Sequence, residues 1–77
     1  MSVEAYVLIE CEHGKSSDVA EKIIKIGGVR DARLVTGPYD VIAHVEASNF
    51  KVLGDVVIKK MQLVKGVKKT LTCVIIA

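Results

Sequence analysis

Several residue types are scarce in this chain, and each scarcity excludes a class of protein. Tryptophan is absent and aromatic residues make up 4% of the sequence, so the chain lacks the stacking platform that single-stranded nucleic acids need. The two cysteines, Cys11 and Cys73, are too few for a disulfide framework and have neither redox-motif nor zinc-motif spacing. We therefore expect both thiols to be reduced and packed.

Long apolar runs and targeting signals are also missing. The longest wholly apolar stretch, 73–77, is far shorter than the roughly 20 residues that cross a bilayer. The N-terminus has an acidic residue, Glu4, and lacks the basic start and long apolar stretch of a signal peptide. The formal net charge of +2 is too small to indicate nucleic-acid binding. These features predict a soluble cytoplasmic protein that neither contacts a membrane nor binds DNA directly.

Aliphatic residues, in contrast, are abundant. Hydrophobic residues make up 51% of the 77 positions, and a chain of this length buries only about 60% of the surface that its unfolded form exposes. One domain over residues 1–77 is the most that this length allows. Because so many Val, Ile and Leu side chains are hard to hide in a monomer, we expect the chain to associate.

Hydrophobic periodicity predicts an alternation of strands and helices. Apolar residues at every second position indicate strands, and apolar residues at spacings of three and four indicate helices. The expected elements are strands at 3–11, 29–36, 41–47 and 67–76, a helix at 17–26, and a longer helix between Ser48 or Asn49 and Gly66. A Gly-Val pair joins each helix to the next strand, so the two halves of the chain are alike. The expected fold class is α+β, a ferredoxin-like βαββαβ sandwich.

One face of the expected sheet has no cover in a monomer. In this fold both helices lie on the same face of a four-stranded antiparallel sheet. Leu8, Leu34, Ile42 and Val74, or their neighbours along the strands, then occupy the other face. A large exposed apolar β-surface favours packing against another chain. We therefore expect a homodimer that forms through the sheet, as in a dimeric α/β barrel.

The segment Gly37-Pro38-Tyr39-Asp40 is the first of two segments that indicate a function. Proline presets φ for a tight turn and glycine admits unusual backbone angles, so the chain should reverse here. Backbone N–H groups outside the ladder could then hold a carboxylate, while Asp40 could hold an ammonium, as the two ends of an amino acid require. The alternative is that Asp40 only braces the turn.

The second segment, 66–72 with the sequence GVKKTLT, opens the last strand. With this fold, this segment and the Gly-Pro-Tyr-Asp turn, the chain resembles the effector-binding domain of Lrp/AsnC, or feast/famine, transcriptional regulators, also called the RAM domain. The likeness covers almost the whole chain. Full-length members carry a helix-turn-helix DNA-binding domain before this module, whereas this sequence starts at its first strand. The chain is thus similar to a stand-alone RAM-type protein without a DNA-binding domain.

The resemblance implies both an assembly and a ligand. In the family, dimers assemble further into rings, here an octamer or a decamer, and small effectors, usually amino acids, bind between dimers. The implied function is effector sensing that modulates transcription. Asp40 would contact the effector ammonium, backbone N–H groups of the turn its carboxylate, and two strand threonines would add hydroxyl contacts. The positions that match the family's site are Gly37, Tyr39, Asp40, Thr70 and Thr72.

Other functions remain open on the sequence alone. The chain could be a ligand-free assembly module that forms mixed oligomers with full-length regulators. It could also be a small dimeric α/β-barrel enzyme with His44, Tyr6 and Glu46 in a cleft, although no nucleophile is paired with a base. An ACT-type amino-acid-binding domain has the same order of elements, but only Gly14 represents its glycine pattern after the first strand.

Metal and cofactor chemistry have little support in the sequence. Cys11, His13 and His44 could be imagined as ligands, but their spacing is irregular and a fourth ligand is missing. The sequence therefore predicts no enzyme activity, no catalytic residue, no metal site and no cofactor.

Overall fold

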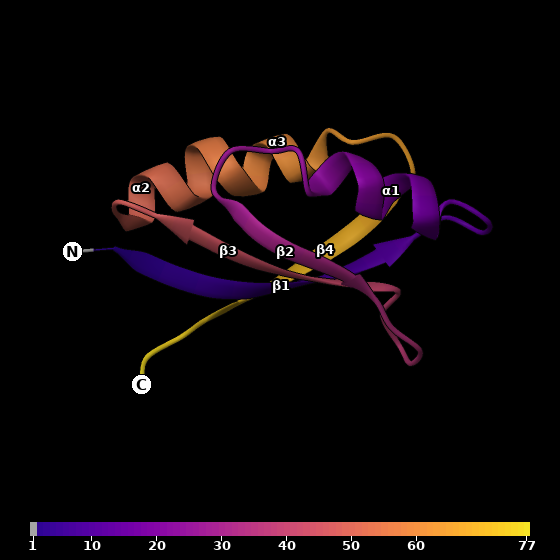
Figure 1. The fold of residues 1–77 in the computed structure, drawn as a ribbon, viewed down its shortest axis with the longest axis horizontal. Coiled ribbons are helices and arrows are strands. Elements are labelled where there is room, and N and C mark those ends of the chain that lie inside the picture. Colours follow the sequence, from indigo (N-terminus) through magenta and orange to yellow (C-terminus); the bar gives the residue numbers. More distant parts are fainter. Residues whose placement is uncertain (1) are drawn as a thin grey trace.

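The computed structural model describes residues 2–77 and shows the expected order of elements. The strands are β1 (Val3–Cys11), β2 (Val29–Leu34), β3 (Val41–Ala47) and β4 (Val67–Val74). Helix α1 (Ser16–Ile23) joins β1 to β2. A second helix joins β3 to β4 and has three consecutive parts, α2 (Phe50–Val52), the π-helical η1 (Leu53–Ile58) and α3 (Lys59–Gln62) (Figure 1).

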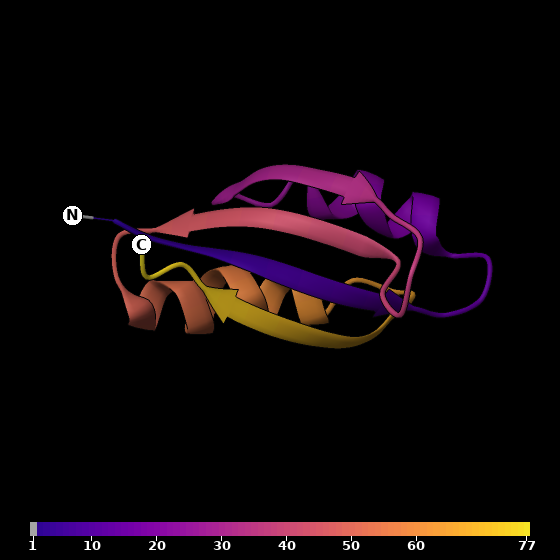
Figure 2. The same ribbon diagram turned by 90° about the horizontal axis from the view of Figure 1, so that it is seen from below.

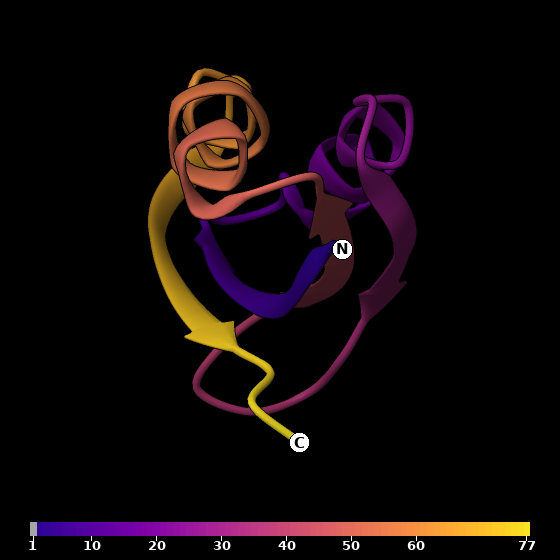
Figure 3. The same ribbon diagram turned by 90° about the vertical axis from the view of Figure 1, so that its left-hand side faces the viewer.

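The strands form one antiparallel sheet in the order β2-β3-β1-β4. Both helices lie on the same face of this sheet, and within residues 2–77 no helix or strand covers the other face (Figures 1 and 3). Each helix joins two strands that are not neighbours in the sheet, as the doubled strand-helix-strand unit requires. The expected ferredoxin-like α+β sandwich is confirmed.

The core lies between the sheet and the two helices. Every second residue of the central strands β1 and β3 points toward the helices, and all of these except the half-buried Val3 are buried. Full burial of a Val, Ile or Met side chain stabilises the fold by about 1.5–3 kcal/mol. The largest fully buried side chains are Ile9, Ile23, Met61, Val7, Val19, Val41 and Val45.

The edge strand β2 departs from strict alternation at Arg30. Between Val29 and Asp31 the strand advances two residues while its partner β3 advances one, so Arg30 is the extra residue of a β-bulge. Strict alternation predicts Ala32 and Leu34 on the face opposite to Val29, and this prediction is wrong. The bulge shifts the alternation by one residue, so all three pair with β3 residues that point to the helices.

The first helix is shorter than the expected 17–26 and ends at Ile23. The N–H of Lys25 donates to the carbonyl of Lys22 at 3.3 Å, and the N–H of Ile26 donates to the carbonyl of Ile23 at 3.0 Å. These bonds span three residues instead of four, so the last turn is too tight to continue as an α-helix.

The uncovered face of the sheet, which is toward the viewer in Figure 2, has an apolar centre. Leu8 lies between Ile42 on β3 and Leu71 on β4, and Tyr6 lies beside Cys73. Tyr6 and Leu71 are 47% and 46% exposed, respectively. An exposed apolar surface on this face is therefore confirmed within one chain.

Two residues expected on this uncovered face lie on the other one. Leu34 and Val74 pair with Val41 and Ala5, whose side chains are buried beneath the helices. The bulge in β2 places Leu34 on the helix-bearing face, and the register of β4 against β1 places Val74 on the same face. Cys73, the neighbour of Val74 along the strand, takes the place on the uncovered face.

Candidate functional site

The turn between β2 and β3 is fixed to the end of β1. The N–H of Val35 donates to the carbonyl of Asp40 at 2.9 Å, which closes the turn. Gly37 has a φ of 145°, a conformation that residues with a Cβ atom rarely adopt. The N–H of Asp40 donates to the carbonyl of Ile9 at 2.9 Å. The chain thus reverses where the sequence predicts it, and β1 sets the position of the turn.

One carboxylate oxygen of Asp40 has a partner within the chain. Its Oδ2 accepts a hydrogen bond from the N–H of Cys11 at 2.8 Å, although the two residues are 29 positions apart. Burial, and then the charge of Asp40, raise the pKa of the Cys11 thiol, while a hydrogen bond with Ser16 lowers it. Asp40 therefore braces the turn against β1, and an effector ammonium would have to share its carboxylate with this backbone N–H.

Thr70 and Thr72 lie on β4, on the other side of β1 from the turn. Their partners on β1 are Ile9 and Val7, which are buried under the helices, so the threonines are on the helix-bearing face of an edge strand. The hydroxyl of Thr70 accepts a hydrogen bond from Nε2 of Gln62 at 3.1 Å. Thr72 is exposed.

Ile9 lies between the two halves of the expected site. Its carbonyl accepts a hydrogen bond from the backbone N–H of Asp40, and its paired residues are Val41 on β3 and Thr70 on β4. The turn and Thr70 are therefore at the same end of the sheet, two strand spacings or about 10 Å apart. Thr72, which pairs with Val7, is nearer the middle of the sheet. Tyr39 and Asp40 are half-buried, and Gly37 is exposed.

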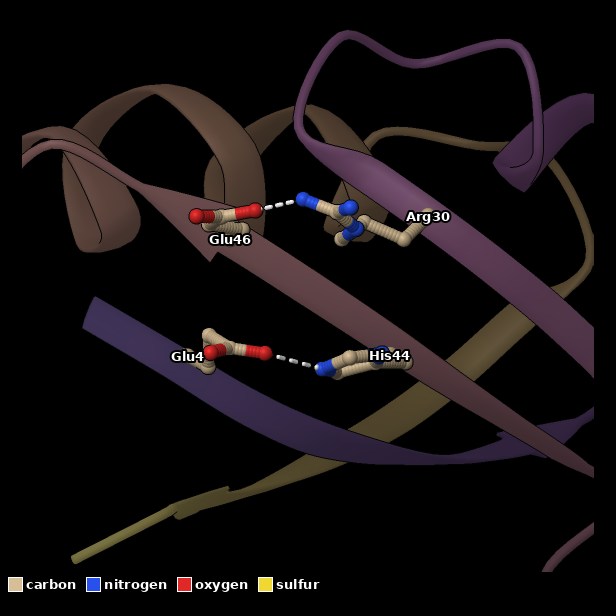
Figure 4. Close-up of polar contacts among 4 residues, drawn as sticks. All are labelled: Glu4, Arg30, His44 and Glu46. Atoms are coloured by element: carbon tan, nitrogen blue, oxygen red, sulfur yellow. Dashed lines mark hydrogen bonds and ion pairs between the residues drawn. The ribbon is translucent and has the colours of Figure 1, made fainter. Parts of the chain in front are cut away.

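The structure gives His44 and Glu46, two residues already named from the sequence, the partners Glu4 and Arg30, which the sequence did not reveal (Figure 4). Nε2 of His44 lies 2.7 Å from Oε1 of Glu4, and the His44 ring stacks on Tyr6 with the centroids 5.2 Å apart. Arg30 forms an ion pair with Glu46 on the neighbouring strand. Alternation along the strands placed Glu4, His44 and Glu46 on one face. Their partners, however, depend on the register and on the bulge at Arg30, which periodicity does not show.

The structure also bears on the metal and membrane interpretations. Within residues 2–77 no group of three or more His, Cys, Asp and Glu side chains is placed to hold a metal ion. The same residues include no helix with the length and apolar character needed to cross a bilayer. Cys11 points toward the helices, whereas His44 is on the uncovered face.

Comparison of sequences relates the chain to one family. Residues 4–77 match the model of the Lrp/AsnC ligand binding domain. The uncharacterized HTH-type transcriptional regulator PF0250 of Pyrococcus furiosus is 36% identical over 77 residues, which cover 96% of this chain and 51% of that protein. The chain thus spans about half the length of this relative. The homocitrate synthase of Sulfolobus acidocaldarius is 33% identical over 76 residues, which cover 97% of this chain and 16% of that enzyme.

Comparison of structures agrees with the sequences. TTHA0845 from Thermus thermophilus superimposes with a TM-score of 0.89 at 31% identity, covering 97% of this chain and 94% of that one. AsnC of E. coli has the same fold, with a TM-score of 0.89 at 21% identity, covering 97% of this chain and 51% of that one. The chain therefore belongs to the Lrp/AsnC family, and its residues 4–77 form the family's ligand binding domain.

Proposed function

We propose that this chain is an effector-binding module that acts in the cytoplasm and modulates transcription. It binds an amino acid at a seam between dimers of a larger homo-oligomer. The observation that carries this proposal is the position of the turn at 37–40. This turn extends from the sheet to the side away from the helices (Figures 1 and 3). A neighbouring chain can therefore reach it and complete a site there.

The relatives support a regulatory role over an enzymatic one. The same domain makes up about half of the HTH-type regulator from Pyrococcus furiosus and a small part of a homocitrate synthase. A DNA-binding regulator and an enzyme share no reaction, but both can be controlled by a bound small molecule. A module that senses an effector serves both, so we infer the same use here.

The geometry of the turn suits a zwitterionic ligand. The turn exposes backbone N–H groups around Gly37, which attract a carboxylate, next to Asp40, which attracts an ammonium. The half-buried Thr70 lies at the same end of the sheet, and the exposed Thr72 is two residues nearer the middle. Because β1 separates them from the turn, we propose that they contact a ligand held by a neighbouring dimer.

The uncovered sheet face supports the assembly. Its apolar centre contains Tyr6, Leu8, Ile42, Leu71 and Cys73, and a contiguous exposed apolar patch favours contact with another protein surface. Pairing with the same face of a second copy would bury it and give the dimeric α/β barrel. Such dimers would then assemble into a ring of eight or ten chains, as the family resemblance implies, with the effector at each seam.

Calorimetry with Asp40→Asn tests the ligand site. Asparagine keeps an oxygen that accepts the Cys11 N–H, so the turn stays braced, but it removes the charge that would hold an ammonium. We expect the wild type to bind at least one of the twenty common L-amino acids, and the variant to bind it about 10- to 100-fold more weakly. Equal affinities would remove Asp40 from the site.

A ligand-free assembly module is the second candidate, supported by apolar residues on the outside of the second helix. Val56 is 40% exposed and Leu63 is 78% exposed, both on the helical layer rather than on the sheet. These residues could join this chain to a full-length regulator in a mixed oligomer. Copurification with such a regulator, lost when Val52 and Val56 are made polar, would favour this function if no amino acid binds.

A further inference from the structure

A second candidate site lies at the other end of the sheet from the turn. A hollow of about 390 Å³ opens where the start of β2 meets the end of β3. Its walls include Ser2, Gly28, Arg30, Glu46 and Ser48, and neither the turn at 37–40 nor the threonines of β4 line it. A volume of this size is near the lower end of the range for small-molecule pockets. The hollow is shallow and open, so a small ligand there would stay in contact with solvent.

Backbone contacts fix the inner wall of this hollow. The carbonyl of Gly28 accepts a hydrogen bond from the N–H of Glu46 at 2.7 Å. Gly28 has a φ of 98°, and a Cβ atom there would lie 2.8 Å from Cγ2 of Val57. The loop before β2 is thus packed directly on β3 and on the second helix. The bulge then turns the side chain of Arg30 toward Glu46.

The charges in the hollow are paired but accessible. Glu46 is directly opposite Glu4 in the sheet, and like charges at such positions repel each other. His44 contacts Glu4, and Arg30 contacts Glu46 (Figure 4). The side chains of Arg30 and Glu46 are 59% and 28% exposed, so their ion pair contributes little to the fold. A ligand that satisfies both charges can therefore separate the pair at small cost.

We propose that this hollow binds an α-amino acid, with the ligand carboxylate on Arg30 and the ligand ammonium on Glu46. Because the two protein charges are in contact, the ligand must carry its own two charges side by side, and an α-amino acid carries them on one carbon. A simple anion would meet the repulsion of Glu46 and Glu4, and a simple cation that of Arg30. Ser2 and Ser48 supply hydroxyl groups at the rim. This site is separate from the turn site and does not depend on it.

Calorimetry with charge-neutral variants tests the proposal. The full chain is titrated with each of the twenty common L-amino acids, and we expect binding that Arg30→Gln and Glu46→Gln each weaken about 10- to 100-fold. Arg33→Gln is the matched control, because Arg33 is on the same strand and its side chain is 76% exposed. It should leave the affinity unchanged. Ethylamine and propionate, which each carry one of the two charges, should not bind.

The Asp40→Asn variant separates this site from the turn site. Binding that depends on Arg30 and Glu46 but not on Asp40 supports the proposal that the hollow binds an amino acid. This holds whether or not a second binding event is lost in Asp40→Asn. Binding that depends on Asp40 alone overturns the hollow and leaves the proposed function intact. Binding unaffected by Arg30→Gln and Glu46→Gln, or no binding of any amino acid, also overturns it. Circular dichroism checks that each variant folds. If either Arg30→Gln or Glu46→Gln does not fold, the other variant alone is sufficient for the test.

Discussion

Gly27 and Gly28 are adjacent in the sequence but have very different surroundings. A Cβ atom at Gly28 would lie 2.8 Å from Cγ2 of Val57 and 2.9 Å from the carbonyl oxygen of Glu46, whereas nothing lies within 4 Å at Gly27. Gly28 also has a φ of 98°, which is unfavourable for any other residue. The backbone at Gly28 is therefore in tight contact with the layers on both sides of this loop.

We predict that Gly28→Ala lowers the free energy of unfolding by about 1–3 kcal/mol, because the new methyl group forces the backbone away from an unfavourable φ and a tight contact. Gly27→Ala is the control and should change stability by no more than about 0.5 kcal/mol. Denaturant unfolding of both variants measures the difference. Equal losses in the two variants would show that the close approach at Gly28 does not stabilise the fold.

Individual polar contacts were the least predictable part of the candidate site. The turn at 37–40 can be read from its glycine and proline, but the bond from Cys11 to Asp40 joins residues 29 positions apart. The pairing of Arg30 with Glu46 likewise depends on one extra residue in β2. Local propensity carries no information on such contacts, because they arise only when the strands are placed side by side.

The start of the second helix shows how the structure chooses between two caps that the sequence allows. Both Ser48 and Asn49 are suitable residues, but it is Oδ1 of Asn49 that accepts a hydrogen bond from the N–H of Val52, at 2.8 Å. Asn49 has the extended backbone of a cap, with φ −159° and ψ 173°. The helix therefore begins at Phe50.

We predict that Asn49→Ala lowers the free energy of unfolding by about 1 kcal/mol, because the N–H of Val52 loses its acceptor. Ser48→Ala should have a much smaller effect, since in this structure the cap bond is made by its neighbour. Thermal unfolding followed by circular dichroism compares the two variants. A greater loss for Ser48→Ala would mean that the helix starts one residue earlier in solution.

At the level of whole elements, the sequence predicted more than it did for single contacts. The alternation in β1 and β3 gave the correct bounds and the correct buried faces. The π-helical part η1 gave no signal in the periodicity. A spacing of four keeps Leu53, Val57 and Met61 on one side of the helix, whether its turns contain slightly fewer or slightly more than four residues.

The uncovered sheet face could be anticipated for the molecule as a whole. A chain of 77 residues with 51% hydrophobic residues cannot bury all of its aliphatic surface against two helices. The structure shows that part of the remainder lies on one side of a single sheet, where Tyr6 and Leu71 are exposed. What the sequence could not give is which residues of the edge strands reach that face, because a bulge or a shift of register exchanges the two faces.

Two substitutions distinguish the sheet face from the helical face as assembly surfaces. Leu71 is 46% exposed on the uncovered sheet face, and Leu63 is 78% exposed on the helical layer. We predict that Leu71→Lys produces monomers, because an ammonium buried within the dimer contact is unfavourable. Leu63→Lys should leave the dimer intact. If this variant forms dimers but no larger oligomer, Leu63 belongs to the contact between dimers. Sedimentation velocity measures both masses.

Light scattering on the wild-type chain, coupled to size-exclusion chromatography and run with and without amino acids, tests most directly whether the uncovered sheet face pairs with another copy. The chain has a mass of 8.3 kDa. We predict a mass that is an even multiple of this value, because dimers paired through the sheet are the building unit. A mass of one chain at every concentration, unchanged by any amino acid, would contradict the paired sheet and the ligand site at its seams.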